Sequence, residues 1–132
     1  MATEILINDG GAPARILPFT AGQAISAGDV LSVNTSGAVV KADTDLGAGH
    51  IEYMCGVAFT DAADGAECSV ISGKGIIVNC NVAGSLTAGK ALKVGNTAGQ
   101  LKANVLLGDT CAVLLESSAA GAGLYKTLII GG

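Results

Sequence analysis

Apolar residues along this chain alternate with polar ones or form short runs, and Gly, Asn, Asp and Ser bound these segments. Such a pattern is typical of β-strands, and no stretch sustains the 3.6-residue apolar period of a helix. Glycines in the segments 34–37, 72–75 and 96–99 suit hairpin-type loops, because glycine adopts positive φ without steric cost. The pattern predicts strands over residues 30–33, 38–42, 56–60, 67–72, 75–80, 91–94, 100–103, 111–116 and 124–130.

A comparison of the chain with itself predicts an internal duplication. The sequence SAGDVLSV at residues 26–33 matches TAGKALKV at residues 87–94, and a Gly-bearing turn follows each of them. Further along, CGV at residues 55–57 aligns with CAV at residues 111–113. Similarity at a nearly fixed offset indicates a repeated structural unit.

We therefore expect an all-β fold, with a small antiparallel β barrel or sandwich of two similar halves over residues 26–132. The pseudo-repeats span about 26–75 and 87–132. Residues 1–25 have no counterpart in the second repeat, and their glycines and prolines favour an extended N-terminal arm. Its large apolar side chains can pack on the barrel as a first strand or on a partner's sheet edge, because each exposed one forfeits roughly 1.5–3 kcal/mol.

The composition of the chain argues against nucleic acid, a membrane and a metal ion as partners. The chain has 132 residues, a net charge of −4 and 3% aromatic residues, so it lacks the basic patch and stacking platforms that nucleic acid needs. An acidic Glu4 near the N-terminus and the shortness of every apolar run predict no secretion signal and no membrane span. Cys55, Cys68, Cys80 and Cys111 lack metal-site spacing, so we expect them to be reduced and buried as small apolar residues.

Residues that could carry catalysis are few. His50 is the only histidine, and it lies in a Gly-rich segment, where we expect an exposed loop residue. The pairs Asp43 with Asp45 and Asp61 with Asp64 lie in turn-like segments, where aspartate serves backbone geometry and stays solvated. The sequence therefore predicts a protein that is not an enzyme and that holds no cofactor and no metal.

Lys74 supports an alternative function. It lies between two predicted strands, and a lysine at a hairpin tip is how biotinyl and lipoyl carrier domains present their modified residue. Its neighbours are Gly73 and Gly75, unlike the Met-Lys-Met or Asp-Lys-Ala sequences that modifying ligases recognise. A carrier domain remains the alternative interpretation.

Five segments of the chain, at residues 26–33, 39–42, 55–59, 64–70 and 73–77, carry a resemblance to a known family. Through them the chain resembles the small head decoration, or capsid cement, proteins of tailed bacteriophages. These proteins are small, rich in Ala and Gly, poor in charge and aromatic residues, and rich in β-structure. The resemblance is one of pattern, clear over residues 26–80 and looser beyond, and this chain departs from it in its complete second repeat and its four cysteines.

The resemblance implies a structural role on the virion. A decoration protein is made in the host cytoplasm, binds the outer surface of the assembled major capsid shell and stabilises it. It is often a homo-oligomer, with a trimer favoured, and it binds neither nucleic acid nor membrane. Its N-terminal segment often contacts the capsid, which makes Arg15 the expected polar anchor. The predicted capsid-contact residues are Ile5, Leu6, Ile7, Arg15, Ile16, Leu17 and Phe19.

Overall fold

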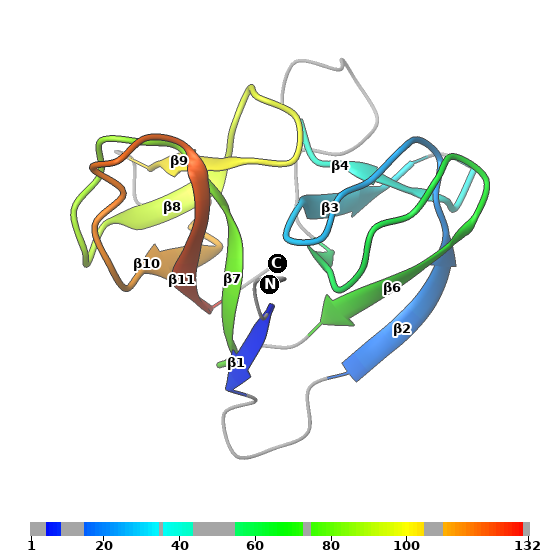
Figure 1. Ribbon diagram of the computed structural model, residues 1–132, viewed down its shortest axis with the longest axis horizontal. Coiled ribbons are helices and arrows are strands. Elements are labelled where there is room, and N and C mark those ends of the chain that lie inside the picture. The colour runs from blue at the N-terminus through cyan, green and yellow to red at the C-terminus, as the bar shows by residue number, and fades with distance from the viewer. Residues whose placement is uncertain are drawn as a thin grey trace.

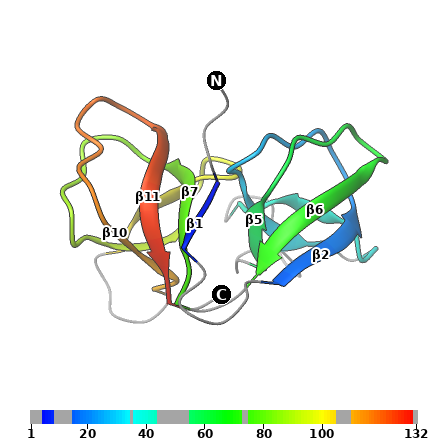
Figure 2. The same ribbon diagram turned by 60° about the horizontal axis from the view of Figure 1, so that its bottom comes forward.

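The chain folds into β-strands joined by turns (Figures 1 and 2). The computed structural model describes residues 5–8, 15–34, 36–43, 55–72, 75–104 and 110–130, which contain no helix and hence no apolar helix that could span a membrane. The strands are β1 (Leu6–Asn8), β2 (Arg15–Thr20), β3 (Val30–Val33), β4 (Val39–Lys41), β5 (Gly56–Ala58), β6 (Glu67–Ser72), β7 (Ile77–Val82), β8 (Ala91–Val94), β9 (Leu101–Ala103), β10 (Ala112–Leu114) and β11 (Gly123–Ile129). Each of the nine predicted strands is confirmed, as β3 to β11.

Two sheets divide these strands, and the expected all-β fold is confirmed. β7, β11, β10, β8 and β9 form a mixed five-stranded barrel, which closes where β7 and β9 pair in parallel at Val82 and Leu101. β1 adds to this sheet along β7. β2, β6, β5, β3 and β4 form a separate antiparallel sheet. The barrel lies on the left of Figure 1 and the antiparallel sheet on the right.

The two sheets repeat one plan of strand pairing. We call residues 15–72 (β2–β6) the first unit and residues 76–129 (β7–β11) the second unit. β2 pairs with β6 as β7 pairs with β11, and β3 lies between β4 and β5 as β8 lies between β9 and β10. A parallel bridge from Ala21 to Val39 joins the first and last strands of the first unit, at the position of the barrel closure in the second unit.

Individual hydrogen bonds confirm this correspondence. The N–H of Gly28 donates to the carbonyl of Ala58 at 2.9 Å, and the N–H of Gly89 donates to the carbonyl of Leu114 at 2.7 Å. Gly28 and Gly89 have φ of 90° and 88°, where glycine is free of the steric penalty of a Cβ. The two units therefore share local backbone geometry as well as strand order.

Residues 15–20, in the segment where we expected an extended N-terminal arm, form a strand of the first unit. β2 pairs with β6 over its whole length, Arg15–Thr20, and corresponds to β7 of the second unit. Ile5 is 5% exposed and lies in the core, so β1 also belongs to the folded domain. Of the two interpretations left open, packing on the chain's own domain is the observed one. The reason is that both strands satisfy their backbone groups in these sheets.

The strands β3, β5 and β6 of the antiparallel sheet carry buried residues on both faces. Val30 and Ile71 belong to the apolar cluster that includes the inside of the second unit, whereas Leu31 and Val70 belong to the cluster inside the first unit. Because successive side chains of a strand point to opposite faces, adjacent residues pack into different clusters. One apolar cluster therefore joins the two units.

Backbone hydrogen bonds also join the units. The N–H of Asn81 donates to the carbonyl of Gly28, and the N–H of Val30 donates to the carbonyl of Gly99, both at 2.9 Å. A Cβ on Gly28 would lie 2.3 Å from a methyl carbon of Leu124, so glycine permits this close approach. The segment 28–30 of the first unit is thus inserted against the second unit.

A matched pair of substitutions tests whether β1 is packed rather than free. We expect Ile5→Ala to lower the free energy of unfolding by about 2–4 kcal/mol, because it leaves a cavity in the core. Ile7→Ala, at a residue 37% exposed, serves as the control and should cost less than about 1 kcal/mol. Urea unfolding followed by circular dichroism measures both. Equal, small effects would show that β1 detaches from β7.

Candidate functional site

The predicted capsid-contact residues Leu6 and Ile7 of β1, and Ile5 directly before it, are only partly at the surface. Ile5 is buried, and Leu6 packs against the same cluster. Ile7 is exposed and is the one large apolar side chain that this strand presents to solvent. Ile5 is therefore not available to a partner while the domain is folded.

The predicted residues of β2 are more accessible. Arg15 is exposed, and Ile16 and Leu17 are 47% and 38% exposed. Phe19 is half-buried against the cluster inside the first unit. Ile16 and Leu17 pair with successive residues of β6, so they point to opposite faces of the sheet. The structure thus leaves four of the seven predicted residues exposed and distributes them over β1 and β2, on different sheets.

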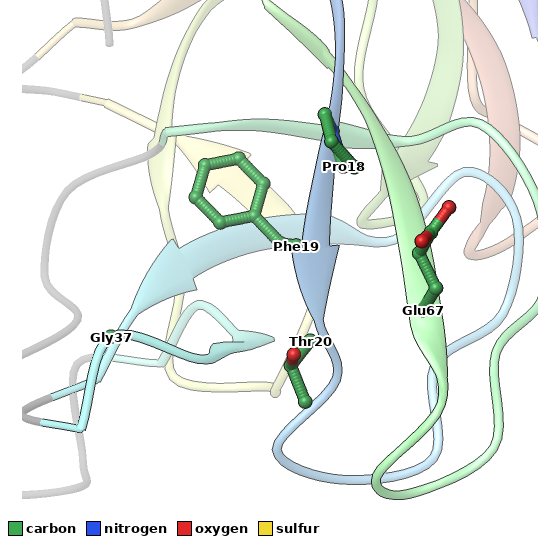
Figure 3. A pocket seen from close by; sticks show the side chains of 5 residues that line it. All are labelled: Pro18, Phe19, Thr20, Gly37 and Glu67. Atoms are coloured by element: carbon green, nitrogen blue, oxygen red, sulfur yellow. The ribbon is translucent and has the colours of Figure 1, made fainter.

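A shallow hollow of about 360 Å³ lies beside β2 (Figure 3). Pro18, Phe19 and Thr20 line it from β2, Glu67 lines it from the neighbouring β6, and Gly37 lines it from the turn before β4. All of these except Phe19 are exposed. Glu67 places an acidic side chain at the rim of this hollow, which we call the β2 hollow.

Pro18 controls what the outer edge of β2 can bind. In the second unit the residue corresponding to Pro18 is Asn79, whose N–H donates to the carbonyl of Ile5 at 2.8 Å and so holds β1. Proline has no N–H, and proline on an edge strand discourages the pairing of a further strand. The edge of β2 therefore cannot hold a strand in the way that β7 holds β1.

Sequence reasoning found Phe19 but missed the other residues of the β2 hollow. The signal that could have found them is the repeat itself, extended to residues 15–20 and 76–81. These segments share alternation and turn spacing rather than identity, with only Ile16 and Ile77 matching. A search for identical residues therefore places the start of each repeat too late in the chain.

The four cysteines are free thiols, and Cys68, Cys80 and Cys111 are buried. Burial raises the pKa of Cys55 to about 11, of Cys80 to about 12 and of Cys111 to about 11, and it also raises the pKa of Cys68. A raised pKa disfavours the thiolate, which is the nucleophilic form. The expectation of reduced cysteines packed as small apolar residues is confirmed for the three buried ones.

Asp43, Asp61 and Asp64, the other candidate side chains that the structure describes, have separate environments. The Oδ1 atom of Asp61 accepts the N–H of Ala27 at 2.7 Å, which is the backbone role expected of it. Asp64 is exposed, whereas Asp43 is buried, so the expectation that Asp43 is solvated is wrong. The described part of the chain contains no group of three or more His, Cys, Asp or Glu that could hold a metal ion. His50 and Asp45 lie outside the described residues.

The prediction of a hairpin around Lys74 is wrong. β6 and β7, which precede and follow this segment, belong to different sheets and do not pair with each other. The segment instead connects the first unit to the second, because strand pairing within each unit is already complete. Lys74 itself lies outside the described residues.

A scan against protein-family models and a search of curated proteins find no match to this chain. Its function therefore has to be argued from its own residues.

Titration of Cys80 predicts a specific loss of stability at high pH. Its pKa is about 12 in the folded protein against 9.0 ordinarily, so its contribution is complete below pH 9 and is lost as the pH rises towards 12. Between pH 7.5 and pH 10.5 we expect wild type to lose about 2 kcal/mol more unfolding free energy than Cys80→Val does.

The measurement is urea unfolding at the two pH values. Val78→Ala, on the same strand, is the control, because it should lower stability by a similar amount at both pH values. Parallel pH profiles for wild type and Cys80→Val would contradict the assignment.

Proposed function

We propose that this protein is a structural decoration, or cement, protein that binds the outer surface of an assembled bacteriophage capsid and stabilises it. The proposal is supported by the resemblance of residues 26–80 to that family and by the exposed apolar side chains of the first two strands. The observation that carries it is the exposure of β2, where Arg15 and Leu17 lie on one face of the sheet, so that a cation adjoins a large apolar side chain, and Ile16 is exposed on the other face. Exposed apolar groups beside a polar rim are typical of protein interaction sites.

The proposed mechanism is linkage between binding and assembly. A ligand that binds only the assembled shell stabilises it by RT ln(1 + [L]/Kd), without any chemical step. Arg15 supplies a charge that can pair with a capsid carboxylate, and Ile16 and Leu17 supply apolar area. If several copies are linked in one oligomer, their weak contacts act together as tight attachment.

The folded position of β1 and β2 changes how this proposal is tested. Deletion of residues 2–20 would remove two paired strands and unfold the domain, so point substitutions are needed. We expect the double variant Arg15→Glu with Leu17→Ser to lose at least about tenfold in affinity for undecorated shells, because it removes a charge and apolar area from the same face of β2. Cryo-electron microscopy of shells mixed with each protein measures occupancy.

Leu115→Ser is the matched control for Leu17→Ser, because both leucines are 38% exposed but Leu115 lies in the second unit, after β10. It should bind shells as wild type does. All three proteins should share one thermal unfolding midpoint to within a few degrees. Folded wild-type protein that leaves shells bare at high concentration would refute the proposed function.

The alternative is a biotinyl or lipoyl carrier domain modified at Lys74. No structural observation favours it, since the strands on either side of this segment do not form a hairpin. Co-expression with a biotin or lipoate ligase, followed by intact mass measurement, separates the two functions. A mass increment on Lys74 would favour the carrier.

A further inference from the structure

The β2 hollow of the first unit corresponds to a place in the second unit that is already filled. Thr20 pairs with Glu67 as Asn81 pairs with Leu124 in the second unit. Gly37 lies two residues before Val39, which forms the parallel bridge of the first unit. Gly99 lies two residues before Leu101, which forms the parallel pair that closes the barrel of the second unit. Gly37 and Gly99 have similar φ, 83° and 78°.

Three residues of the second unit, Asn81, Gly99 and Leu124, receive the segment 28–30 of the first unit. Asn81 and Gly99 bond to its backbone, and Leu124 lies against Gly28. We call this place the filled socket. The β2 hollow offers Thr20, Gly37 and Glu67 at the same three positions.

The segment that fills the socket also has a counterpart. Residues 89–91 occupy in the second unit the place of residues 28–30 in the first. Two equivalent hydrogen bonds support this correspondence. The N–H of Ala58 donates to the carbonyl of Asp29 at 2.9 Å, and the N–H of Leu114 donates to the carbonyl of Lys90 at 3.0 Å. Exposure is where the two segments differ.

Residues 28–30 are buried, with Asp29 only 7% exposed. Gly89 and Lys90 are exposed, and a Cβ placed on Gly89 would meet nothing within 4 Å. The interface between the two units has two sides, a socket and an inserted segment. The chain also carries a second version of each side that is not in use: the β2 hollow on the first unit and the exposed segment 89–91 on the second.

We propose that the β2 hollow of one molecule receives residues 89–91 of a second copy of this chain, so that copies associate head to tail. The N–H of Thr20 then donates to the carbonyl of Gly89, and the N–H of Ala91 donates to the carbonyl of Gly37, by correspondence with the bonds inside one chain. Pro18 is compatible with this contact, because the contact omits the β1 strand that Asn79 holds in the second unit.

Charge favours this pairing. Residues 15–72 carry seven acidic and two basic residues, whereas residues 76–129 carry two acidic and four basic ones. The first unit of one copy and the second unit of another are thus oppositely charged. At the proposed contact, Lys90 of one copy faces Glu67 at the rim of the β2 hollow of the other. At the corresponding positions inside one chain, Asp29 is the inserted residue and Leu124 stands in the place of Glu67. Opposite charges across an interface select partner and orientation.

Head-to-tail contacts are heterologous, so repetition of one contact closes a ring when the rotation allows it. The alternation of first and second units around such a ring would continue the arrangement inside each chain. This inference concerns the protein alone and goes beyond the proposed capsid binding. It is therefore tested without shells, and its failure leaves that proposal standing.

The test is a charge swap in the full chain, followed by sedimentation velocity over a range of concentrations at low and high salt. Glu67→Lys and Lys90→Glu each place like charges at the contact, and each should weaken self-association at least about tenfold. The double variant Glu67→Lys with Lys90→Glu restores opposite charges and should return the affinity to within about threefold of wild type.

Asp64→Lys and Lys126→Glu are the matched controls, because both residues are exposed, lie outside the hollow and the segment, and undergo the same charge changes. They should associate as wild type does. Thermal midpoints identify any variant that fails to fold. A wild-type protein that stays monomeric at every concentration would overturn the proposal, as would an oligomer that both single variants leave intact.

Discussion

The structure depends on the insertion of one backbone segment, residues 28–30, against the neighbouring unit. The N–H groups of Asn81 and Val30 and the carbonyls of Gly28 and Gly99 bond across this contact. A second bond from Gly99, to the carbonyl of Ala42, extends it at 2.9 Å. Glycine permits the contact, because a side chain on Gly28 would collide with Leu124. Without it, two units of similar strand plan would be joined only by a short connection and a shared apolar cluster.

Duplication explains several features together. A chain with few aromatic residues builds its core from Val, Ile, Leu and Cys, and each unit alone is small for an independent domain. Burial of Val30 and Ile71 against the second unit gives the first unit a second apolar face. Each unit has both a socket and a segment that can be inserted into one. Because two units in one chain form only one such contact, the hollow of the first unit and the segment 89–91 of the second remain unpaired.

Strand positions could be predicted from the sequence because they follow from local alternation and turn glycines, as at Gly37 and Gly99. The role of residues 15–25 could not, because β2 and β7 match in pairing rather than in identity. The exposure of Ile16 and Leu17 agrees with their predicted availability, whereas the burial of Ile5 depends on pairing with a strand more than 70 residues away. The β2 hollow depends on three segments distant in sequence, so no local pattern could indicate it.

Native-state hydrogen exchange, read by NMR, tests the central claim most directly. The amides of Val30, Asn81 and Gly99 donate the bonds between the units, and amides such as that of Cys111 lie inside one unit. If the two units fold as one body, the three inter-unit amides exchange only through global unfolding, with the same opening free energy as the most protected amides of both units. Exchange of these three at a distinctly lower free energy, with each unit still protected, would contradict the account.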